Sequence, residues 1–183
     1  MKQSGTKLVV GLAGLALAAG LASWSYQYEA THQSTRFWGS KASLLIARPS
    51  EVEFFRLELA AADADAGEDS RLQLDLGRPY RGRQTRKLTK ERGMVHFRHA
   101  LMTDGNYEWA SQPAPDEINW RWCLRFHDEQ FQALVVLAED LATIGLVEEG
   151  SSPPVRTLSC QPMAETLREY FRGVGLTTAS TAE

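Results

Sequence analysis

The sequence predicts an α+β protein in which an N-terminal transmembrane or signal helix precedes a mainly antiparallel sheet of five to six strands with two packed helices. Three observations support this prediction. An uncharged apolar run lies near the start of the chain, alternating apolar and polar residues mark several short strands, and two later segments have the period of an amphipathic helix. The 183 residues provide enough chain for one globular domain beyond the apolar run.

The first residues have the pattern of an export signal. Lys2 and Lys7 precede a run of apolar and small residues, 8–22, that carries no charge. As a helix, residues 8–26 would measure roughly 28 Å, close to the roughly 30 Å of a bilayer's hydrocarbon core. Amphipathic rings follow the run and are expected at the membrane interface. They are Trp24, Tyr26 and Tyr28.

The aromatic residues favour a retained anchor at 8–26, but a cleaved signal peptide stays open because Gly20 and Ala22 are small enough for a signal peptidase. The lysines before the run predict the orientation. Residues 1–7 are expected in the cytoplasm, and the domain is expected on the periplasmic side of a bacterial inner membrane that the chain crosses once.

Three segments are expected after the anchor: a stalk, a globular domain that contains an acidic loop, and a tail. Residues 27–42 are polar and aromatic without a clear period, which predicts a stalk. A single globular α+β domain is expected at 43–175, and a disordered tail at 176–183. Within the domain, the small and acidic stretch 60–70 is expected to be a surface loop.

Alternating residues predict the strands of the domain, and tight connections in its second half predict an antiparallel meander. The predicted strands are 43–60, 72–76, 120–126, 131–138, 141–147 and 155–160. Two segments have a helical period instead. The first, 89–103, places Met94, Phe97 and Leu101 on one side, and the second begins at Pro162.

The second half of the chain carries a recognisable pattern. Trp120, Trp122, Cys123 and Phe126 form a Trp-x-Trp-Cys-x-x-Phe strand, followed by a hydrophobic hairpin and a helix that begins at Pro162. This arrangement resembles the closing half of small, uncharacterised exported bacterial proteins with a short N-terminal anchor. The resemblance covers about half of the chain. That group has no established activity, so the resemblance implies no functional residues.

The densest charge lies between Arg78 and Arg98, where eight cations and one acid, Glu91, give about +7 in a chain whose net charge is −3. Such a surface attracts anionic lipid, a cell-wall polymer or a partner subunit. The alternative is that these residues are ordinary solvated charges that pair with the acidic loop 60–70. Nucleic acid is not an expected partner of an exported domain. The cations are Arg78, Arg81, Arg83, Arg86, Lys87, Lys90, Arg92 and Arg98.

A metal site is the alternative interpretation of the helix at 89–103. His96 and His99 lie on its polar side near Arg92, and two histidines at this spacing can share an ion. Asp104 is the nearest carboxylate, and a third ligand is not evident, so a simply exposed pair is favoured.

The cysteines allow two further interpretations. Cys123 has Arg121 and Arg125 beside it and would be a nucleophile if they lowered its pKa, but a small buried residue is favoured. A disulfide between Cys123 and Cys160 is open for an exported domain. The chain has no serine-nucleophile elbow, zinc-protease motif or phosphate loop, so neither an enzyme nor a cofactor is expected.

The leading functional hypothesis is a membrane-anchored extracytoplasmic accessory or binding domain, such as a small subunit of a membrane complex. It would use the basic surface at 78–98, with Trp38, Tyr107 and Trp109 as contact residues. The alternative is a small exported enzyme or metal-binding protein that uses His96 and His99.

Overall fold

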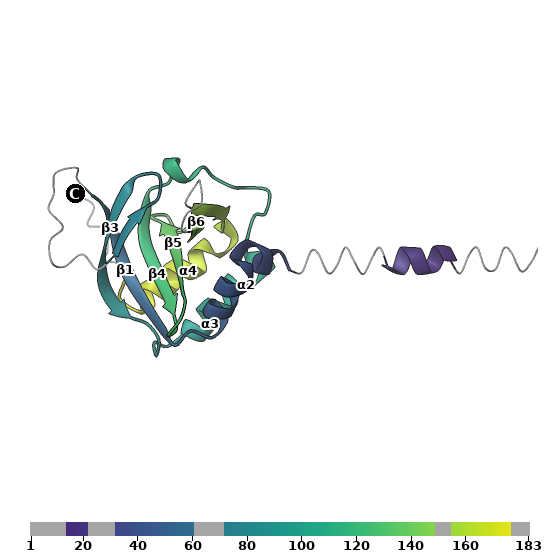
Figure 1. Cartoon of the computed structure of the whole chain (residues 1–183), viewed down its shortest axis with the longest axis horizontal. Helices are drawn as coiled ribbons and strands as arrows, with labels where there is room; N and C mark the ends of the chain where they lie inside the picture. The colour runs from purple at the N-terminus through teal and green to yellow at the C-terminus, as the bar shows by residue number, and fades with distance from the viewer. Residues whose placement is uncertain (1–13, 22–31, 61–71, 149–154, 177–183) are drawn as a thin grey trace, which may run out of the picture. The chain divides into compact units, whose positions relative to one another are not determined.

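The computed structural model describes residues 14–21, 32–60, 72–148 and 155–176 (Figure 1). The chain divides into two units, Met1–Gln33 and Ser34–Glu183. In the first unit, residues 14–21 are helical. Within the described ranges, no helix has both the length and the apolar character needed to cross a membrane.

The second unit is an α+β domain built on one antiparallel sheet, as the sequence predicts. The strand order is β2-β3-β1-β4-β5-β6-β7, and every neighbouring pair is antiparallel. The predicted meander is confirmed as the last four strands. The strands are β1 (Glu51–Leu59), β2 (Leu72–Asp75), β3 (Pro79–Lys87), β4 (Trp120–His127), β5 (Gln132–Ala138), β6 (Thr143–Val147) and β7 (Val155–Ser159).

Seven strands are described, more than the five to six expected, because the pattern does not reveal β3. Tyr80 is the one large apolar residue in that strand, whose other members are polar, glycine or proline. Its backbone is nevertheless paired on both sides, with β2 and with β1. Hydrogen bonding of the backbone to two neighbours therefore holds a strand that side-chain alternation alone would not predict.

One face of the sheet buries a core to which no α-helix of the described residues contributes. Leu72 and Leu74 of β2 lie in the same buried cluster as Val155 of β7, although these strands are at opposite ends of the strand order. This core therefore extends over one face of the curled sheet from β2 to β7 (Figure 1). Gly145 fits this tightly packed core, because a Cβ there would lie 2.6 Å from Val155 Cγ1.

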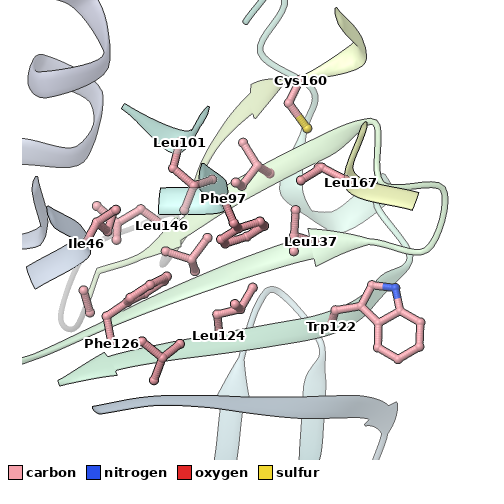
Figure 2. Packing of buried hydrophobic residues seen from close by; sticks show 14 of the residues in the cluster. Ile46, Phe97, Leu101, Trp122, Leu124, Phe126, Leu137, Leu146, Cys160 and Leu167 are labelled. Carbon is pink, nitrogen blue, oxygen red and sulfur yellow. The ribbon is translucent and has the colours of Figure 1, made fainter. Parts of the chain in front are cut away.

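Three helices cover the other face: α2 (Gln33–Ala47), α3 (Met94–Leu101) and α4 (Ala164–Gly173). Figure 2 shows how their apolar side chains meet the sheet, with Phe97 and Leu101 of α3 above Leu124 and Leu137 of the strands. The amphipathic helix predicted after Pro162 is confirmed as α4, preceded by a short 3₁₀ turn, Gln161–Met163.

Helix α2 corrects two expectations. Residues 33–42 were expected in the stalk, but they are helical and bury Phe37 and Trp38 in the core. The strand predicted at 43–60 begins at Glu51, because residues 43–47 complete the same helix. The helical period is hard to detect because Gly39, at φ 71° and ψ 166°, kinks α2 and changes the phase of its apolar positions.

Helix α3 is shorter than the segment predicted at 89–103. It starts at Met94, since Gly93 has a left-handed φ of 87° that the α-helix does not contain. Thr89, the first residue of the predicted segment, lies outside the helix, and its hydroxyl accepts a hydrogen bond from the backbone N–H of Val52, at 2.9 Å. Thr89 thus ties the chain before α3 to the start of β1.

Several expectations fall on residues that the structure does not describe. They are most of the anchor at 8–26, the interface residues Trp24, Tyr26 and Tyr28, most of the acidic loop at 60–70, and the tail from residue 177. These stay predictions.

Candidate functional site

Part of the predicted basic surface holds the fold together. Arg78 donates hydrogen bonds to the carbonyls of Asp116 and Ile118, at 3.0 and 3.2 Å. Arg98 donates to the carbonyl of Ala47 at the end of α2, at 3.0 Å. These guanidinium groups bind backbone carbonyls of other segments, which is a structural use of the charge.

Arg86 has a similar structural role at α4. Its guanidinium donates to the carbonyl of Val174, at 2.5 Å, and pairs with Glu91 at 2.7 Å. Tyr170 lies beside this pair, and burial together with the Glu91 charge raises the pKa of its phenol to about 12. Tyr170 is therefore neutral at physiological pH.

Four arginines nevertheless share one face of the sheet, and we call Arg56, Arg81, Arg83 and Arg86 the arginine face. Opposite residues of an antiparallel pair share a face, and Arg56 is opposite Arg83 in the β1–β3 register. Arg81 is opposite Glu58 and belongs to the same face. A β-bulge leaves residue 85 without a partner in β1. Arg86 therefore lies on the same face as Arg83.

The centre of the arginine face contains hydrogen-bond donors without acceptors. Within the described part of the chain, Arg56 Nε and Trp122 Nε1 are buried and have no hydrogen-bond partner. The two residues are opposite each other in the β1–β4 register. The carboxylate of Glu58 is 4.0 Å from Arg56 Nε, beyond a hydrogen bond. Arg121 adds a fifth guanidinium 5.9 Å from the Trp122 ring.

The remaining cations of the predicted surface lie elsewhere. Lys90 and Arg92 are exposed on the segment between β3 and α3. Lys87 is at the end of β3, where it forms an ion pair with Glu51. Residues 78–98 therefore do not form one continuous site. Arg56 belongs to the arginine face but lies outside this segment, so the sequence pattern does not reveal it. The anion-binding role of the whole set stays a prediction.

A second cluster of charged residues lies on the opposite face of the sheet. Glu51 and Glu53 of β1 share that face with Phe55, whereas Arg56 shares the other face with Phe54. Glu53 has a side chain that is only 8% exposed and forms an ion pair with Arg125 of β4, whose Nε is 2.6 Å from Glu53 Oε2.

Next to this ion pair, His127 of β4 completes a group that we call the Glu-His cluster: Glu51, Glu53 and His127. His127 Nε2 is 3.5 Å from Glu51 Oε2 and 3.5 Å from Glu53 Oε2. The cluster is the group of three possible metal ligands found among the described residues. The hydrogen bond and charge of Lys87 lower the pKa of Glu51, so this carboxylate is ionised at neutral pH.

A pocket of about 660 Å³ opens beside the Glu-His cluster. Its volume lies within the range of small-molecule sites in proteins. Glu51, Lys87 and His127 line it together with Asp128 and Glu129 of the β4–β5 turn. Sequence analysis missed this site. The available signal was Glu53, an acid within the otherwise apolar run at the start of β1.

His96 and His99 do not belong to that cluster. Both are exposed on α3, and basic Arg98 lies between them in the sequence. A metal at this pair remains an alternative interpretation from the sequence.

Both cysteines are buried and free, and they lie in the two different cores, Cys123 on the curled face and Cys160 under the helices. The sheet therefore separates them, and they form no disulfide. Burial raises the pKa of the Cys123 thiol far above its usual range despite the opposing charge of Arg125, and burial raises the pKa of Cys160 to about 12.

We therefore expect both thiols to be unreactive in the folded protein, because a thiol is nucleophilic only as the thiolate. Titration with a thiol-specific chromogenic reagent at pH 8 should detect no fast-reacting group before unfolding and both cysteines in guanidinium. One thiol that reacts rapidly in the native protein would contradict the burial of that residue.

Two aromatic residues expected to contact a partner belong to the core instead. Trp38 is 1% exposed and Tyr107 is 5% exposed, so the prediction that they are surface contact residues is wrong. They pack with Phe37 and with Trp109, which is half-buried. An aromatic residue outside a clear periodic pattern can equally belong to an irregular part of the core.

The fold and its charged faces define the class of protein as an α+β domain with a curled antiparallel sheet, helices on one face and charged clusters on both faces. No known family model matches the chain, and neither a curated protein nor a solved structure is detectably similar to it. The function must therefore be argued from its own residues.

Proposed function

We propose that this protein is a membrane-anchored extracytoplasmic accessory or binding domain that holds an anionic group of its partner on the arginine face. The observation that carries this proposal is the direct opposition of Arg56 and Arg83 across β1 and β3. Like charges directly opposite each other destabilise a sheet, and an anion between them removes that penalty. Guanidinium groups bind carboxylate and phosphate through paired hydrogen bonds.

The unpaired donors beside this pair support the same function. Trp122 is 8% exposed, and its indole N–H has no acceptor among the described residues. An anion that reached Arg56 from the solvent side would add acceptors where the donors now outnumber them. Arg83 is exposed and therefore available to a partner.

The membrane part of the proposal rests on the sequence of residues 1–28. Trp24, Tyr26 and Tyr28 after the uncharged run at 8–22 support a retained anchor, and Lys2 and Lys7 before it support a domain on the periplasmic side. A tether near anionic headgroups would strengthen the role of the arginine face, since each cation close to such a surface contributes about 1 kcal/mol. A C-terminal reporter active only in the cytoplasm would contradict this orientation.

Anion binding can be tested with the full-length protein in mild detergent, using tripolyphosphate as the probe in isothermal titration calorimetry. We expect wild-type binding to weaken as salt is raised, because exposed charges are screened. Arg56→Gln/Arg83→Gln should lower the affinity at least about tenfold, which corresponds to about 1.4 kcal/mol.

Arg48→Gln is the matched control, because Arg48 is an exposed arginine that follows α2 and lies outside the arginine face. It should bind tripolyphosphate like the wild type. Equal losses in the control and in the double variant would mean that general charge, and not the arginine face, attracts the anion.

A further inference from the structure

We propose that the Glu-His cluster, Glu51, Glu53 and His127, is a binding site for a divalent transition-metal ion of the Zn²⁺ class. The three side chains offer two carboxylate oxygens and one imidazole nitrogen, all within 4.8 Å of one another. Zn²⁺ binds this combination of ligands, with three protein ligands and an open position in sites of the catalytic type. The inference is independent of the arginine face, which lies on the other side of the sheet.

The spacing of the donor atoms fits an ion better than a hydrogen bond. His127 Nε2 is 3.5 Å from an oxygen of each carboxylate, at the outer limit for a hydrogen bond. Bonds of about 2.0–2.2 Å to a tetrahedral Zn²⁺ would place neighbouring donor atoms about 3.3–3.6 Å apart. Nε2 is also buried without a hydrogen-bond partner among the described residues. An ion among the three atoms would satisfy it.

The sheet holds these ligands in place. Glu51 is opposite His127 and Glu53 is opposite Arg125 in the β1–β4 register, so all the side chains project from two paired, central strands. Ligands on such a rigid support keep their positions with little loss of conformational entropy on binding. Arg125 donates to Oε2 of Glu53, the same oxygen that lies near His127, so an ion would share this oxygen with the guanidinium, which would then orient the ligating carboxylate as an outer partner.

Lys87 is a cation that would compete with an ion for Glu51, although it pairs with Oε1 of that carboxylate and the oxygen near His127 is Oε2. Its ammonium forms the ion pair with Glu51, but its side chain is 65% exposed and extends from the end of β3. An exposed ion pair contributes little to stability, so the ammonium can move into solvent at small cost. The pocket of about 660 Å³ beside Glu51 and His127 gives an ion and its remaining water ligands a path to the site.

Cobalt(II) titration of the full-length protein in detergent tests this site, because bound Co²⁺ has visible absorption that reports its coordination, and Zn²⁺ should displace it. We expect His127→Ala and Glu51→Gln each to weaken Co²⁺ binding at least about tenfold. Lys87→Met should strengthen binding about two- to fivefold, because it removes the competing ammonium. A merely structural role of these residues would not produce that gain.

His96→Ala/His99→Ala is the matched control, since it removes two exposed histidines of α3 and leaves the Glu-His cluster intact. It should bind Co²⁺ like the wild type. Thermal unfolding without metal checks that each variant is folded, and Lys87→Met, at an exposed position, keeps the test decisive if His127→Ala does not fold. Absence of Co²⁺ binding by the wild type, a loss confined to the control, or an unchanged affinity in Lys87→Met and Glu51→Gln would overturn the proposal.

Discussion

Replacing Trp38 by alanine is expected to lower the free energy of unfolding by about 3–5 kcal/mol, the usual cost of removing a large buried aromatic side chain. The indole is 1% exposed and contacts the rings of Phe37 and Tyr107. Its Nε1 also donates a hydrogen bond to the carbonyl of Leu101 in α3, at 2.8 Å. Urea unfolding of the full-length protein, followed by circular dichroism, measures the change.

Trp38→Phe is the control for this prediction. It keeps most of the apolar contact and loses the indole N–H, but the Leu101 carbonyl still accepts a hydrogen bond from the Tyr107 hydroxyl, at 2.6 Å. We therefore expect a clearly smaller loss than for alanine. A change below about 0.5 kcal/mol for Trp38→Ala, which is typical of surface positions, would mean that residues 33–42 form the stalk that the sequence predicts and not a core helix.

Replacing Arg125 by methionine is expected to have the second-largest effect, a loss of about 3 kcal/mol. The variant leaves the Glu53 carboxylate buried without its cation, and breaking a buried ion pair on one side usually costs about 3–5 kcal/mol. The lower end of that range applies here because the Arg125 side chain is 26% exposed.

Glu53→Leu/Arg125→Met should recover most of this loss, since an apolar pair at both positions leaves no uncompensated charge in the sheet. The two single variants and the double variant form a thermodynamic cycle that measures the coupling between the side chains. Additive losses in that cycle would show that the two groups do not interact, against the 2.6 Å contact between them.

The second half of the chain was largely predictable because its elements are local. The strands β4 to β7 follow one another with short connections, and residues that alternate in the sequence alternate between the two faces of the sheet. In α4, Leu167 and Phe171 are four residues apart and both are buried, as the helical period requires. Each of these signals arises within one element and needs no knowledge of its neighbours.

The elements that were missed depend on distant neighbours. Strand β3 contains mostly polar residues and is held by backbone pairing with β1 and β2. Helix α2 is interrupted at Gly39, and its place in the core depends on packing against α3, as the hydrogen bond from Trp38 to Leu101 shows. A single-sequence pattern does not contain these partners.

The same distinction applies to the candidate sites. The amino-acid sequence by itself determined the class of fold, the meander, the amphipathic helix and the abundance of cations between residues 78 and 98. Only the tertiary structure decided which charges meet. Arg56 lies opposite Arg83, and Glu53 meets Arg125 from 72 residues away, because strand register brings together positions whose spacing in the chain carries no local signal.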